Sequence, residues 1–121
     1  MERIVKSGPG WRLGLNPEAE KFQGLVAGNE WSIELTAGEF EDFCRLLDQL
    51  SKAINQMSDE LMDEERILCE AESDLLWMQV EGFPESYTVQ FILNQGRRAE
   101  GKWPVQAVPG LVQAAQMLKV F

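Results

Sequence analysis

Four residues near the end of the chain are of types that could contact a phosphate group, a nucleobase or an acidic surface. They are Arg97, Arg98, Lys102 and Trp103. Proteins that bind single-stranded nucleic acid combine arginine with an aromatic ring, because the cation meets the phosphate and the ring stacks on a base. Two structural explanations compete with this one: positive side chains on strand edges discourage aggregation, and a tryptophan in a strand more often packs in a core. The four residues are therefore candidate contacts for a nucleic-acid or protein partner.

The chain offers little nucleophilic or imidazole chemistry, since it holds two cysteines and no histidine. This composition excludes histidine-based acid–base mechanisms, zinc fingers and a disulfide scaffold. Cys44 falls on the apolar stripe of a predicted helix, and Cys69 shares an alternating strand face with Ile67 and Ala71. Both cysteines are therefore predicted to be small core residues.

Paired carboxylates are the remaining chemical candidates. Glu70 and Glu72 would lie on one face of a strand, at a spacing compatible with acid–base catalysis or with a divalent cation. Such pairs arise by chance in a chain with 20 Asp and Glu residues, and no calcium-binding or phosphate-binding loop motif accompanies them. We therefore expect a protein that is not an enzyme, with no catalytic residue, no cofactor and no metal site.

Net charge bears on the class of partner. Lys and Arg total 11 against 20 Asp and Glu, a formal charge of −9, which opposes binding to phosphate backbones and membranes. The acidic residues concentrate between Ser58 and Asp74, a segment that is either a solvated connector and half-exposed strand or a docking surface for a basic partner. No apolar run is long enough to span a membrane, and no signal peptide opens the chain. The expected location is the cytoplasm.

The elements that must position these residues fall into two similar halves. Strand-like stretches at 2–7, 11–16, 21–27 and 31–35 precede Thr36 and Glu39, which form a capping-box pattern. A helix is predicted over 37–56, with apolar residues at three- and four-residue spacing. The second half has strand-like stretches at 65–72, 75–81, 87–93 and 97–103, followed by a helix with Pro109 in its first turn.

The two halves align with each other. Residues 2–5 match 65–68, and 31–46 match 103–118 without a gap, which places Trp31 opposite Trp103. Two meander-and-helix units could share such features by chance, but an internal duplication explains them together. The prediction is an α+β fold built from a duplicated β4-α unit: two four-stranded antiparallel sheets, each followed by one helix, related by a pseudo-twofold axis. One domain would span 1–121, with repeats at 1–57 and 65–121 joined by an acidic connector at 58–64.

The Gly8–Arg12 segment, the Trp31–Glu39 segment and the Trp103-Pro104 pair resemble a small family of uncharacterised cyanobacterial proteins. The duplicated plan in turn resembles the single-stranded-DNA-binding regulator fold of the Whirly proteins and positive-cofactor coactivators. The resemblance implies architecture but transfers no site residue, because the lysine-rich Whirly motif Lys-Gly-Lys-Ala-Ala-Leu has no equivalent in this sequence. Together these observations favour a non-enzymatic binding protein with a protein partner. The alternative is a single-stranded nucleic-acid-binding transcriptional regulator.

Overall fold

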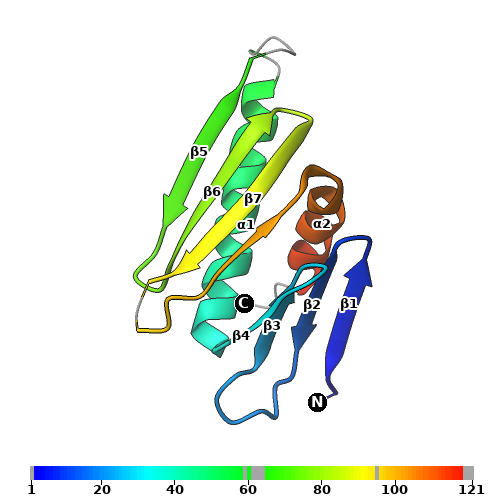
Figure 1. Ribbon diagram of the computed structural model, residues 1–121, viewed down its shortest axis with the longest axis vertical. Coiled ribbons are helices and arrows are strands. Elements are labelled where there is room, and N and C mark those ends of the chain that lie inside the picture. Colours follow the sequence, from blue (N-terminus) through cyan, green and yellow to red (C-terminus); the bar gives the residue numbers. More distant parts are fainter. Residues whose placement is uncertain (1, 59, 61–64, 95, 119–121) are drawn as a thin grey trace.

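The computed structural model describes residues 2–58, 60, 65–94 and 96–118, and it consists of two antiparallel meanders, each followed by a helix (Figure 1). The first sheet has the order β1-β2-β3-β4, with strands Ile4–Gly8, Trp11–Leu15, Gly24–Ala27 and Ser32–Leu35, and it precedes α1, Ala37–Ser58. The second has the order β5-β6-β7-β8, with strands Ile67–Glu72, Leu76–Phe83, Ser86–Leu93 and Glu100–Trp103. A 3-10 turn, η1 (Val105–Ala107), leads from it into α2, Val108–Leu118. The predicted α+β fold with a duplicated β4-α unit is confirmed.

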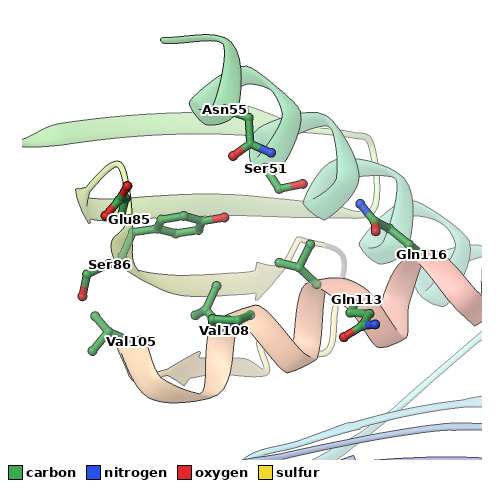
Figure 2. A pocket seen from close by; sticks show the side chains of 11 residues that line it. Ser51, Asn55, Glu85, Ser86, Val105, Val108, Gln113 and Gln116 are labelled. Atoms are coloured by element: carbon green, nitrogen blue, oxygen red, sulfur yellow. The ribbon is translucent and has the colours of Figure 1, made fainter. Parts of the chain in front are cut away.

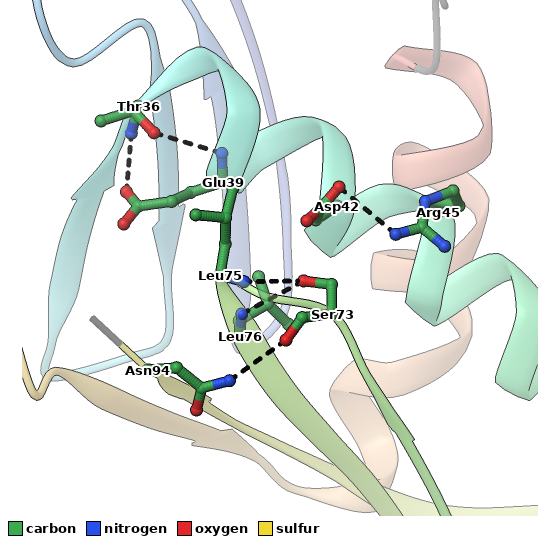
Figure 3. A network of polar contacts seen from close by, with 8 residues as sticks. All are labelled: Thr36, Glu39, Asp42, Arg45, Ser73, Leu75, Leu76 and Asn94. Carbon is green, nitrogen blue, oxygen red and sulfur yellow. Dashed lines mark hydrogen bonds and ion pairs between the residues drawn. The ribbon is translucent and has the colours of Figure 1, made fainter.

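The start of α1 forms as its sequence predicts. The Thr36 amide donates to Glu39 Oε1 at 2.8 Å, and the Glu39 amide donates to Thr36 Oγ1 at 3.2 Å (Figure 3). This reciprocal pair satisfies two donors that the first helical turn leaves open. The predicted apolar stripe of the helix is buried, with its members at 3% exposure or less: Phe40, Phe43, Leu47, Leu50 and Ile54.

Each helix packs mainly on the sheet of the other repeat. The first-repeat helix α1 lies along β5 and β6, whereas α2 lies on β2 and β1 (Figure 1). The lengths of the helices and strands match this exchange of helices between the two sheets. The 22 residues of α1 span about 33 Å, which suits the eight-residue strands β6 and β7 at about 26 Å. The 11 residues of α2 span about 16 Å, close to the five-residue strands β1 and β2 at about 17 Å.

An aromatic cluster joins the two repeats at the centre of the core. Phe43 of α1 packs edge-on against Phe91 and Trp103, with ring centroids 5.5 and 5.6 Å apart. Trp31 lies 4.9 Å from Trp103 across the same cluster. Because residues of both repeats make up this cluster, the two sheets share one core.

The gap-free match of 31–46 with 103–118 is wrong at the last strand. Trp31 precedes β4, whereas Trp103 is the last residue of β8, so Leu35 rather than Trp31 occupies the place corresponding to Trp103. The cause is local: only Thr36 separates β4 from α1, whereas Pro104 and η1 separate β8 from α2. The two tryptophans are neighbours in the core without being equivalent.

The predicted acidic connector lies mostly outside the described residues, which omit 59 and 61–64. Within the described part of the chain, no helix combines the length and the apolar character needed to cross a membrane.

Candidate partner-binding surface

The structure places Trp103 inside the protein. Its side chain has no exposed surface, its indole stacks on Phe91 at 5.6 Å, and its Nε1 donates to the Ala27 carbonyl oxygen at 2.9 Å. A ring enclosed in this way cannot stack on a base or contact a partner. The expectation that Trp103 belongs to an exposed arginine-tryptophan patch is therefore wrong, and its role is to join the two sheets.

Arg97 acts as a clamp between the repeats. Its guanidinium donates to Glu39 Oε1 at 2.6 Å and to the Glu34 carbonyl oxygen, and it stands over the Phe22 ring at 4.6 Å. Glu39 is 7% exposed, so the arginine neutralises a nearly buried carboxylate at the start of α1. The partners of Arg97 all come from the first repeat, and its guanidinium is already committed to them.

The other two cations of the predicted patch are exposed, but they are not gathered into one surface with the first two. Arg98 has a positive φ of 52° in the loop between β7 and β8. Lys102 projects from the outer face of β8, where its register partner is Gln90. Of the four candidate contacts, only Arg98 and Lys102 are free to meet a partner.

The candidate nucleophiles and Glu70 of the candidate carboxylate pair are also packed against, or hydrogen-bonded to, other residues of the protein. Cys44 is buried in the core and Cys69 is half-buried on the inner face of β5. Glu70 accepts hydrogen bonds from Trp77 Nε1 and Gln79 Nε2, both at 3.3 Å. Among the described residues, no group of three or more Cys, Asp and Glu side chains is arranged to hold a metal ion.

The outer face of the second sheet is an uncovered surface. In β6 the residues alternate between buried and half-exposed, so that Trp77, Gln79 and Glu81 point away from the core. α1 lies on the inner face of this sheet, and no described helix or strand covers the outer face (Figure 1). The cross-strand pairs continue the surface over β5 and β7, with Trp77 beside both Glu72 and Ile92.

This outer face combines acidic groups with exposed apolar side chains. Four glutamates lie on it against two cations: Glu70, Glu72, Glu81 and Glu100 against Arg66 and Lys102. Arg66 already pairs with Glu81 at 3.4 Å. Leu68 is 58% exposed and Phe83 is 38% exposed, beside the half-buried Trp77 and Ile92. Apolar side chains bordered by polar and charged groups, here with an excess of carboxylates, are characteristic of a surface that binds a partner.

Trp77 is the residue of this surface that the sequence reasoning overlooked. The alternation of Leu76, Met78 and Val80 with Trp77, Gln79 and Glu81 places the tryptophan on the polar side of the strand. That period-two signal was sufficient to separate Trp77 from the core tryptophan Trp103.

Comparison with known proteins agrees with this fold and leaves the activity open. A family model described as a domain of unknown function, DUF1818, matches residues 6–118, and the chain belongs to that family. A crystal structure from Prochlorococcus sp. NATL2A, described as a protein of unknown function from the DUF155 family, is similar with a TM-score of 0.90 and 27% identity. The match covers 95% of this chain and 98% of that one. No curated protein matches the chain.

Proposed function

We propose that the protein is a non-enzymatic, cytoplasmic binding protein that uses the outer face of its second sheet to bind a basic surface of a protein partner. The observation that carries the proposal is the combination of four glutamates with the apolar side chains of Leu68, Trp77 and Ile92 on one uncovered face.

Charge determines the chemistry of the partner. The face has an excess of carboxylates, and the whole chain carries a formal charge of −9, so approach of a lysine- or arginine-rich surface is favoured and approach of a phosphate backbone is opposed. The apolar side chains supply the part of an interface from which water is excluded.

Trp77 is held in a position that suits a cationic side chain. Its indole nitrogen donates to Glu70, which fixes the ring beside a carboxylate before any partner arrives. An arginine or lysine that enters there meets an aromatic ring and a carboxylate together, and such an arrangement strengthens cation–π contact. Preorganisation of this kind reduces the side-chain entropy lost on binding.

The Whirly-like alternative, a regulator that binds single-stranded nucleic acid, has weaker support. It depended on Arg97 and Trp103, and the first is engaged with Glu39 while the second is buried. Arg98 and Lys102 would remain as its phosphate contacts.

Site-specific photocrosslinking in cells tests the proposal. A photoreactive residue at Leu68, on the outer face of the second sheet, should yield a crosslinked protein, and the same residue at Ser7, on the outer face of the first sheet, should not. The captured protein is then identified, purified and titrated against the parent chain. We expect its binding surface to be basic and its affinity to fall with rising salt, because exposed charges are screened.

Charge reversal supplies the matched control. Glu72→Lys should weaken the affinity for the purified partner about tenfold or more, whereas Glu41→Lys, on the exposed side of α1, should leave it nearly unchanged. Equal crosslinking from Ser7, or equal loss of affinity in both variants, contradicts the proposal. Tight binding of a single-stranded oligonucleotide at physiological salt that Arg98→Ala together with Lys102→Ala abolishes would establish the alternative instead.

A further inference from the structure

A hollow on another side of the molecule lies where three elements meet, away from the outer face of the second sheet. Its volume is about 320 Å³, and its walls come from the second half of α1, from α2 with the turn before it, and from the β6–β7 hairpin. Figure 2 shows Ser51 and Asn55 on the α1 side, Val108, Gln113 and Gln116 on the α2 side, and Glu85 and Ser86 on the hairpin. The volume is at the lower end of the range found for small-molecule sites.

The floor of the hollow is apolar. Val105, Val108, Pro109 and Val112 line it together with the ring of Tyr87. Val105 is 39% exposed although it is a large apolar residue, and part of its surface faces this space. A flat apolar ligand placed here would remove these side chains from water.

The rim carries polar side chains that have no hydrogen-bond or ion-pair partner among the described residues. The side chains of Asn55, Glu85 and Gln113 and the hydroxyl of Tyr87 make no hydrogen bond or ion pair with any described residue. Ser51 and Gln116, by contrast, donate to the carbonyl and the carboxylate of Asp48. Polar groups without a protein partner around an apolar floor are available to orient a ligand in a small-molecule site.

The charge of the lining favours a cationic ligand. Glu85 is the carboxylate among the lining residues, and neither lysine nor arginine lines the hollow. Lys52, one residue from Ser51, is held by Asp48 at 2.9 Å. The phenol of Tyr87, whose pKa burial raises above its ordinary value, is neutral at neutral pH, and its oxygen can accept a hydrogen bond.

We propose that this hollow, formed by α1, α2 and the β6–β7 hairpin, is a binding site for a small planar organic cation, an aromatic ring that bears an amidinium, guanidinium or ammonium group. The ring lies on the valine floor beside Tyr87, the cationic group pairs with Glu85, and the side-chain carbonyl oxygens of Asn55 and Gln113 accept hydrogen bonds from its remaining N–H groups. This site goes beyond the proposed protein-binding function and does not depend on it.

Three isosteric probes test both the site and its charge preference. Benzamidine, benzamide and benzoate share one ring and carry positive, neutral and negative groups. In an amide-resolved NMR titration of the full chain, benzamidine should shift saturably the signals of Glu85 to Tyr87 and of the first turns of α2. Benzamide should bind more weakly, and benzoate should not bind, because it would face Glu85.

One substitution isolates the charge. Glu85 is exposed in a turn, so Glu85→Gln keeps the fold, which the same spectra verify. It should weaken benzamidine binding about two- to fivefold, the range of an exposed ion pair, and should leave benzamide binding unchanged. Glu72→Gln, on the outer face of the second sheet, is the matched control and should leave both unchanged.

Four outcomes overturn the proposal: no saturable shift with benzamidine, shifts that map elsewhere, benzoate binding as tightly as benzamidine, or equal benzamidine affinity in Glu85→Gln and the parent. Each is independent of the crosslinking result from Leu68. Failure of one proposal is therefore distinguishable from failure of the other.

Discussion

The two sheets have the same strand order, and their inner faces meet in one core, but their outer faces differ. On the first sheet, Phe22 and Ala19 of the β2–β3 loop stand beside Val5 and Leu25 around a shallow hollow, and Arg97 reaches across from the second repeat to the Glu34 carbonyl. The second sheet has longer strands, and its outer face is uncovered and acidic. The comparison shows that one topology leaves the outward residues free to vary, because only the inward residues are needed for the core.

The largest expected effect is at the point where the inner faces meet. Phe43→Ala removes a fully buried ring between Phe91 and Trp103, and it should lower the free energy of unfolding by about 3 to 5 kcal/mol. Phe83→Ala, on the outer face of the second sheet, should cost less than about 1 kcal/mol. Urea denaturation of both variants measures the difference. Equal costs would show that Phe43 is not enclosed in the core that the two repeats share.

A close approach between the repeats gives the next effect. A Cβ atom at Gly101 of β8 would overlap the Trp31 ring, so Gly101→Ala should destabilise the protein by about 1 to 3 kcal/mol. At Gly14, on the outer face of the first sheet, a Cβ would lie at an ordinary 3.4 Å from Leu25 Cβ, and Gly14→Ala should change stability by less than about 1 kcal/mol. The melting temperatures of the Gly101→Ala and Gly14→Ala variants, compared with that of the parent chain, measure the difference. A neutral Gly101→Ala would contradict the tight packing of Trp31 on β8.

The Arg97 clamp is expected to be weaker than the core. Arg97→Ala leaves the nearly buried Glu39 without its cation and should lower the free energy of unfolding by about 1 to 2 kcal/mol. Arg98→Ala, the adjacent exposed arginine, should change it by less than about 0.5 kcal/mol. Urea denaturation, which does not screen charges as guanidinium chloride does, measures the free energy of unfolding of both variants. If the two variants were equally stable, Arg97 would not join the sheets.

The smallest effect concerns pH and Tyr87, which lies on the second sheet and is the only tyrosine of the chain. Burial raises the pKa of its phenol in the folded state above the ordinary 10.0, so near that pH the folded protein retains a proton that the unfolded chain loses. Its contribution to stability is complete below about pH 10 and decreases as the pH rises further. The ultraviolet absorbance of tyrosinate follows this one residue. A midpoint at or below the ordinary value would contradict burial of the phenol.

Local patterns in the sequence determined the elements of this protein. Period-two alternation predicted the strands, Thr36 and Glu39 predicted the start of α1, and the spacing of Phe40, Phe43 and Leu47 predicted its buried side. These features depend on residues a few positions apart, and hydrogen bonding and burial within one element suffice to produce them.

Only the tertiary structure decided which residues remain available for binding. The sequence offered Arg97 and Trp103 as contacts for a partner. In the folded protein Arg97 instead binds Glu39, 58 residues away, and the Trp103 indole donates to Ala27, 76 residues away. The exchange of α1 and α2 between the sheets and the hollow beside Glu85 likewise form from segments distant in sequence. Alternation along a strand specifies that side chains point to opposite faces, but which face is covered depends on the other repeat, whose position no local pattern encodes.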